Sequence, residues 1–84
     1  MEEKVGKVTH YYNKLGVAAI EIEHGKLHKG DKIHFVGHST DAEQTIDSIE
    51  YEHQPIVEAD EGLNVGVKVV DRVRENDDVY KTYI

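Results

Sequence analysis

The chain has 84 residues, no cysteine and a formal net charge of −7. The absence of cysteine excludes disulfides, thiolate metal sites and cysteine nucleophiles. The acidic balance opposes non-specific binding to nucleic acid, which depends on neutralising phosphates. No apolar run approaches the roughly 20 residues of a membrane-spanning helix, and the charged start Met1–Lys4 is not typical of a signal peptide. We therefore expect one cytoplasmic domain, residues 1–84, with no membrane segment.

The first half of the chain predicts three strands. Residues Val5 to Tyr12 are rich in β-branched and aromatic side chains, and a turn at 13–16 follows them. Residues Val17 to Ile22 alternate apolar and polar side chains, as in a half-buried strand. Gly25 and Gly30 then bracket a tight corner with Leu27 as an apolar plug, and at least one of these glycines is expected at positive φ. The next strand covers Ile33 to Val36.

The second half predicts three more strands. The fourth runs from about Glu43 to His53, with a β-bulge near Asp47 or Ser48 that restores its alternation. Pro55 should end this strand, because proline cannot donate to a central ladder. Residues 56–61 form a connection. The last two strands are Val65 to Val69 and Val79 to Tyr83.

Six short strands with turn signals between them predict an all-β fold. Closure of the sheet would remove its exposed edges, so we expect a closed six-stranded Greek-key β-barrel. The inward positions of the alternating strands give the expected core: Val8, Ala18, Ile20, Ile22, Ile33, Phe35, Ile46, Ile49, Val65, Val67 and Val69.

Four groups of residues occur in an order and spacing that resembles a known small barrel, the second domain of translational GTPases such as elongation factor Tu and initiation factor two. The groups are Gly6-Lys7-Val8; Gly16-Val17-Ala18; Gly25, Leu27, Gly30 and Asp31; and Ala59, Gly62 and Val65-Gly66-Val67. The resemblance covers nearly the whole chain and implies the translation-protein type of barrel.

The same barrel is also similar to the C-terminal module of collagenase-like peptidases. Residues 6–12 and the ending Val79-Tyr80-Lys81 resemble that version more closely. Neither the Gly-rich phosphate loop nor the guanine motif of a GTPase occurs in the chain, so GTP binding and hydrolysis are not expected. A shared fold leaves the function open between the two families.

Catalytic and metal chemistry are not expected. The chain has six histidines, but no pair has a zinc-finger spacing, and we interpret them as surface residues on strands and turns. Carboxylate pairs such as Asp60 with Glu61 need a cleft that shifts their pKa values, and a small barrel filled by apolar side chains has none. We predict no catalytic residue, no metal site and no cofactor, and hence no enzyme.

The strongest candidate partner surface is the end of the first strand. Of Tyr11 and Tyr12, one should be exposed, because adjacent strand residues face opposite sides. An exposed tyrosine beside Lys14 could stack on a base or anchor a protein, and Arg72 and Arg74 could extend the patch.

The sequence thus predicts a non-catalytic binding module that docks on RNA, the ribosome or a translation-associated protein. The alternative is a free-standing accessory barrel of the collagenase-like peptidase type that acts through protein–protein contacts. The partner and the oligomeric state are left open by the sequence.

Overall fold

The computed structural model describes residues 1–83, which form ten β-strands and no helix. The strands are β1 (Glu2–Tyr12), β2 (Val17–Ile22), β3 (Leu27–His28), β4 (Lys32–Val36), β5 (Asp41–Thr45), β6 (Ile49–Tyr51), β7 (Gln54–Ile56), β8 (Glu58–Ala59), β9 (Asn64–Lys68) and β10 (Asp78–Thr82). All of their pairings are antiparallel, which confirms the all-β fold class. Among residues 1–83 there is no helix with the length and apolarity that a membrane crossing requires.

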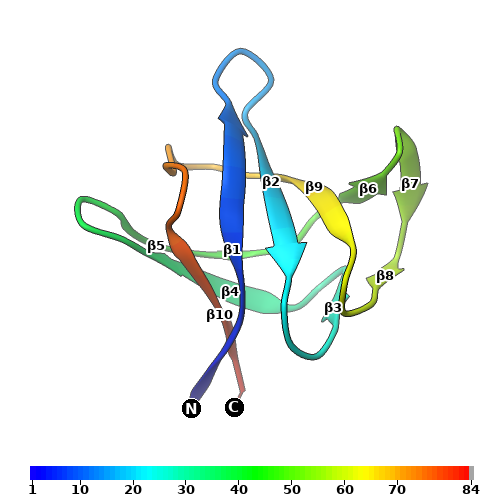
Figure 1. Cartoon of the computed structure of the whole chain (residues 1–84), viewed down its shortest axis with the longest axis horizontal. Helices are drawn as coiled ribbons and strands as arrows, with labels where there is room; N and C mark the ends of the chain where they lie inside the picture. The colour runs from blue at the N-terminus through cyan, green and yellow to red at the C-terminus, as the bar shows by residue number, and fades with distance from the viewer. Residues whose placement is uncertain (84) are drawn as a thin grey trace.

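Eight strands form one strongly curved sheet in the order β5-β4-β10-β1-β2-β9-β6-β7, and β3 pairs with β8 in a small second sheet (Figure 1). The two ends of the chain lie side by side, and the Tyr83 amide donates to the Met1 carbonyl at 2.7 Å. The turn between β1 and β2 projects from the opposite end of the molecule (Figure 1).

No continuous backbone ladder closes the described sheet, since its order ends at β5 and β7. The closed six-stranded barrel is therefore not confirmed by the strand pairing. A side chain joins β5 to the segment around the end of β9 instead. The Gln44 amide nitrogen donates to the Lys68 carbonyl at 2.9 Å, and the Gln44 amide oxygen accepts from the Val70 amide at 3.0 Å.

The core lies inside the curve of the sheet and contains every residue that the alternation predicted. Phe35 and Ile20 have no exposed surface, which confirms the inward register of β4 and β2. The prediction missed five further buried apolar side chains: Val5, Leu27 as a core member, Ala59, Val73 and Val79. Val79 belongs to the predicted last strand, whereas Val73 lies in a charged connection without alternation.

The predicted fourth strand is two strands. It breaks into β5 and β6 because Ile46 leaves the ladder between them, so the bulge expected at Asp47 or Ser48 is a break. The Ile46 amide donates to the Asp31 carbonyl, and the Gly30 amide donates to the Ile46 carbonyl, both at 2.8 Å. Pro55 does not end a strand either. It lies inside β7, an edge strand, where a missing N–H is tolerated.

The glycine corner has the predicted geometry. Gly25 and Gly30 both have positive φ, 74° and 98°. Between them Leu27 is fully buried and pairs with Ala59 across β3 and β8. The corner therefore anchors a surface turn to the core through one leucine side chain.

Candidate docking surface

The structure separates the residues predicted as a partner surface. Tyr11 packs against the core and lines a shallow hollow of about 240 Å³ with Arg72 and Arg74. Tyr12 is 47% exposed and faces a different hollow. Lys14 is exposed in the turn between β1 and β2 and lines neither hollow. Tyr11 therefore lies with the two arginines, apart from Tyr12 and Lys14, and a role for these residues in RNA binding stays a prediction.

A larger depression, which we call the groove, crosses the outer face of β2, β9 and β6. It consists of two adjoining hollows of about 290 and 240 Å³, which share four of their lining residues. The groove is lined by Tyr12, Leu15, Val17, Ala19, Ser48, Glu50, Glu52, His53, Asn64, Val65, Gly66 and Lys68.

The floor of the groove exists because the outward positions of neighbouring strands carry small residues. Gly66 pairs with Ala19 on one side and with Glu50 on the other. Val65 and Val67 are buried, so Gly66 between them faces outward. A Cβ atom built on Gly66 would lie 3.3 Å from Cγ1 of Val17 and would take up space at the floor of the hollow.

The two sides of the groove differ in chemistry. One side consists of Tyr12, at the end of β1, and Leu15, which is 69% exposed in the turn that follows. The β6–β7 hairpin supplies Glu50 and Glu52, both exposed. Neither carboxylate has an ion-pair partner within 4.0 Å among residues 1–83. The groove therefore places an apolar side opposite free negative charge.

The hairpin that carries Glu52 has an unusual turn. Glu52 and His53 both have positive φ, 51° and 64°, as a two-residue type I′ turn requires. Asn-Gly is the usual sequence at such a turn, because a β-carbon in the left-handed region is strained. No such signal is present here, which is why the sequence did not predict this hairpin or the groove beside it.

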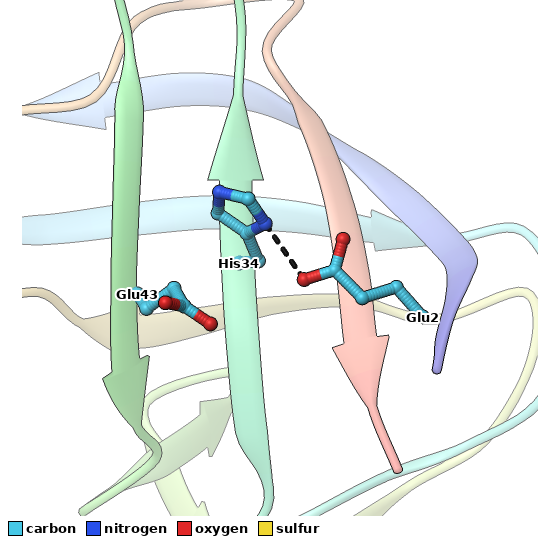
Figure 2. A group of neighbouring side chains, drawn as sticks. All are labelled: Glu2, His34 and Glu43. Atoms are coloured by element: carbon cyan, nitrogen blue, oxygen red, sulfur yellow. Dashed lines mark hydrogen bonds and ion pairs between the residues drawn. The ribbon is translucent and has the colours of Figure 1, made fainter.

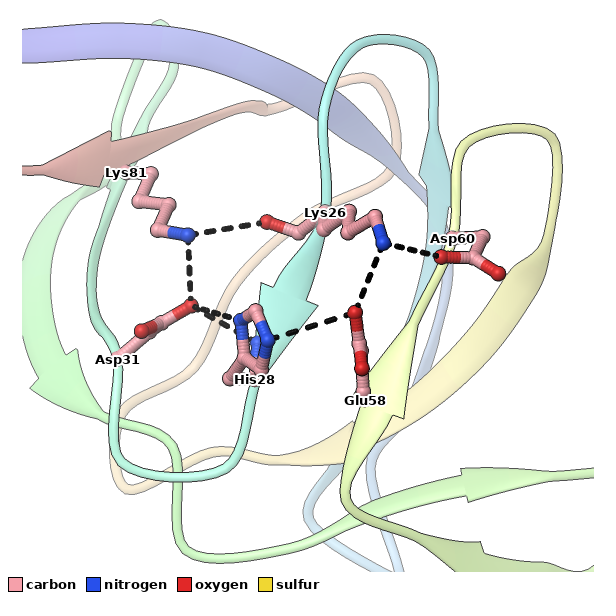
Figure 3. Close-up of polar contacts among 6 residues, drawn as sticks. All are labelled: Lys26, His28, Asp31, Glu58, Asp60 and Lys81. Atoms are coloured by element: carbon pink, nitrogen blue, oxygen red, sulfur yellow. Dashed lines mark hydrogen bonds and ion pairs between the residues drawn. The ribbon is translucent and has the colours of Figure 1, made fainter.

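A second polar region, which we call the polar corner, surrounds β3 and consists of Lys26, His28, Asp31, Glu58, Asp60 and Lys81 (Figure 3). Lys26 Nζ lies 3.0 Å from Oε1 of Glu58 and 3.5 Å from Oδ1 of Asp60. The hydrogen bond with Glu58 raises the pKa of Lys26. The same bond lowers the pKa of Glu58.

Asp31 is the second centre of the polar corner. Its Oδ2 accepts from the backbone amide of His28 at 2.8 Å and from Nζ of Lys81 at 3.0 Å. Lys81 also donates to the Lys26 carbonyl at 3.2 Å (Figure 3). The ionic groups of the polar corner thus satisfy one another and tie β10 to the glycine corner.

A third polar cluster joins β1, β4 and β5, with the Glu2 side chain of β1 reaching His34 of β4 across β10, which lies between these two strands (Figure 2). Nδ1 of His34 is 2.7 Å from Oε2 of Glu2, and Nε2 is 2.5 Å from Oδ1 of Asp41. The hydrogen bond with Asp41, assisted by Glu2, raises the pKa of His34. Both ring nitrogens donate only in the imidazolium form, which these two carboxylates favour.

Glu43 on β5 completes a group of three possible metal ligands with Glu2 and His34, and their ligand atoms lie within 4.8 Å of one another (Figure 2). Both nitrogens of His34 already face carboxylates, so the ring offers no free lone pair in this arrangement. Motif spacing missed this cluster because Glu2 and His34 are distant in the sequence and meet only through strand pairing.

Two proteins with protease names match nearly the whole chain. A collagenase of Porphyromonas gingivalis is 40% identical over 78 residues, which are 92% of this chain and 22% of that protein. An uncharacterized protease of Methanocaldococcus jannaschii is 38% identical over 78 residues, 92% of this chain and 19% of that protein. The chain thus spans about a fifth of the length of these curated relatives.

A solved structure shares the fold. It is the C-terminal domain of a protein assigned to the U32 peptidases from Geobacillus thermoleovorans, with a TM-score of 0.88, 23% identity and coverage of 96% of this chain and 93% of that domain. The sequence model of the Elongation factor Tu domain 2 family matches residues 16–80. Both kinds of barrel whose motifs this chain resembles are therefore represented among the matches. The chain belongs to the Elongation factor Tu domain 2 family.

Proposed function

We propose that the chain is a non-catalytic accessory barrel of the collagenase-like peptidase type, which acts through protein–protein contacts. The observation that carries the proposal is the 40% identity to a collagenase over 92% of the chain. This relationship favours the peptidase alternative over docking on RNA or the ribosome. The family name alone refers to a fold that several functions share.

The charges of the surface also favour a polypeptide partner. The groove carries two carboxylates without an ion pair among residues 1–83, Glu50 and Glu52, against one lysine, Lys68, so its net negative charge would repel the phosphates of RNA. The arginines beside Tyr11 line only a small hollow, and Glu75 lies with them. A non-catalytic role agrees with the polar clusters, whose ionic groups pair with one another around an apolar core.

We further propose that the curved sheet acts as the closed six-stranded barrel of its family. The Gln44 amide bonds both the Lys68 carbonyl and the Val70 amide, the two kinds of group that a neighbouring strand would bond. Replacing Gln44 by Leu should then increase amide hydrogen exchange at Val70 and in β5, and unchanged exchange would argue against closure through this side chain.

A domain exchange tests the accessory role. In the Porphyromonas gingivalis collagenase, the 78 matched residues are replaced by this chain, and collagen cleavage is compared with the parent and with a deletion of the same residues. We expect the chimera to keep most of the activity that the deletion loses. A folded chimera as inactive as the deletion would overturn the proposed role.

The competing function has its own measurement. Filter binding of the isolated chain to tRNA and to ribosomal RNA fragments should give no salt-sensitive association, because the surface is acidic. Tight binding that weakens steeply with salt would instead support the translation-related role. A matched variant, Arg74→Glu, would then show whether the hollow beside Tyr11 is the contact.

A further inference from the structure

We propose that the groove binds an extended polypeptide segment in which a large apolar side chain lies next to a lysine or arginine. This inference rests on the proposed function, because it specifies the protein partner that an accessory barrel would contact. It assigns the apolar side chain to the floor of the groove and the cation to the β6–β7 hairpin.

The apolar part of the site is a preformed hollow. Ala19 and Gly66 leave the outer face of two paired strands without bulk, and Val17 forms its wall. Leu15 is 69% exposed at the edge of this hollow. An apolar side chain inserted there would cover part of the exposed surface of Leu15, and such burial is favourable.

The charged part of the site, at the β6–β7 hairpin, is negatively charged. Residues 41–61 contain eight acidic residues and no Lys or Arg. Several of these acids are paired elsewhere, as Glu58 is with Lys26, but Glu50 and Glu52 have no ion pair among the described residues. A lysine or arginine of a partner would supply the missing counter-charge.

Strand register gives the groove a direction. In the antiparallel pair β6–β9, Glu50 lies opposite Gly66, so the hairpin end with Glu52 lies toward Asn64. The other end is lined by Lys68 and Ser48. A bound segment would therefore place its cation near Asn64 and away from Lys68, because like charges repel.

The test is a titration of the ¹⁵N-labelled chain with an acetylated, amidated peptide of sequence Gly-Leu-Arg-Gly-Leu-Arg-Gly, followed by NMR. Two matched peptides replace both arginines by glutamate or both leucines by serine. We expect shifts at Leu15, Val17, Glu50 and Gly66 with the first peptide, and at least about tenfold weaker binding of either matched peptide.

Variants of the chain separate the two parts of the site. Leu15→Ser should weaken binding about tenfold, while Val70→Ser, at an equally exposed position (74% against 69%), should leave it unchanged. The double change Glu50→Gln with Glu52→Gln should weaken binding about threefold to tenfold. Asp71→Asn is the control for this double change. Asp71 is exposed, lies outside the groove and has no ion pair among residues 1–83.

Each other outcome counts against the groove. Shifts around Tyr11, Arg72 and Arg74, equal binding of the three peptides, or no binding at millimolar concentration would overturn the proposal. So would concentration-dependent shifts without peptide at the groove, which would indicate a second copy as its occupant. A collagenase chimera that stays active when Leu15→Ser and the double Gln change are introduced would overturn the groove alone and leave the accessory role intact.

Discussion

The polar corner and the groove lie on the same small all-β domain, but their charged groups differ in whether they are paired. In the polar corner, Lys26 lies 3.0 Å from Glu58, and Lys81 lies 3.0 Å from Asp31. In the groove, Glu50 and Glu52 have no such partner among residues 1–83. The corner holds two short strands against the core, whereas the groove holds nothing within the described chain. In these two regions, paired charge thus accompanies the structural element, and free charge accompanies a hollow that could receive a partner.

The apolar residues of the two regions differ in burial, as the charged residues differ in pairing. Leu27 in β3, which the polar corner surrounds, is fully buried, and Leu15 at the groove is 69% exposed. Each leucine lies within two residues of a glycine, so their local sequences look alike. Their difference comes from what faces them: β8 covers Leu27 through Ala59, while Leu15 projects from a turn beyond the sheet.

The two leucines give the largest expected difference in stability. Leu27→Ala should lower the free energy of unfolding by about 3–4 kcal/mol, because it leaves a cavity in the core. Leu15→Ala should change it by less than about 0.5 kcal/mol, because the side chain is exposed. Urea denaturation of both variants measures the difference, and similar losses would contradict the contrast between the two regions.

Replacing a glycine of the glycine corner should give the next largest change in stability. Gly30 has a φ of 98°, and a β-carbon added there would meet no other part of the chain within 4 Å, so conformation rather than space should decide the outcome. Gly30→Val should cost about 1–2 kcal/mol, since a β-branched residue fits this region poorly. Gly30→Asn is the control, because asparagine tolerates left-handed backbone, and it should cost clearly less. Equal thermal unfolding of the wild type and the valine variant would disprove this account of the corner.

A glycine introduced into the β6–β7 hairpin beside the groove should increase stability, whereas the glycine replacement above decreases it. His53 has a φ of 64°, so His53→Gly relieves left-handed strain and should raise the free energy of unfolding by about 0.5–1 kcal/mol. Gln54→Gly, one residue further on in β7, is the matched control and should be destabilising, because glycine weakens a strand. Thermal unfolding measures both variants, and a loss of stability in His53→Gly would show that the histidine makes contacts that outweigh its strain.

Local pattern was enough to predict most of the fold. Alternation in β2, β4 and β9 identified the inward residues, and the Gly25 to Gly30 spacing identified the corner. The local sequence pattern gave the wrong strand boundaries where tertiary contacts determine the backbone conformation. Ile46 is buried as predicted but lies outside any strand, because its backbone bonds Asp31 and Gly30 and not a neighbouring strand. The β6–β7 turn has no turn sequence.

The site could be predicted less well than the fold. The tyrosines were a reasonable choice, and Tyr12 does line the groove. The groove itself arises from Ala19, Gly66 and Glu50, which come from three strands and meet only through their pairing. These three residues are far apart in the sequence, so no local stretch contains them together. A single glycine in a strand indicates only that a ligand or another backbone approaches closely or that a side chain is missing there. Register, which is set by the whole sheet, was the missing information.

The His34 cluster gives the smallest expected effect and tests whether paired charge stabilises this part of the sheet. Because the carboxylates of Asp41 and Glu2 raise the pKa of His34 in the folded chain, their contribution to stability is complete below the unfolded pKa and is lost as the pH rises through the folded pKa. Since Asp41 is exposed, the contribution should be at most about 0.5 kcal/mol. The gap in unfolding free energy between the wild type and His34→Gln should therefore be larger near about pH 6 than near about pH 9.

His38→Gln, at an exposed histidine in the turn before β5, is the control. A gap for His34→Gln that does not change with pH would mean that the ring stabilises the barrel by packing and not by its charge.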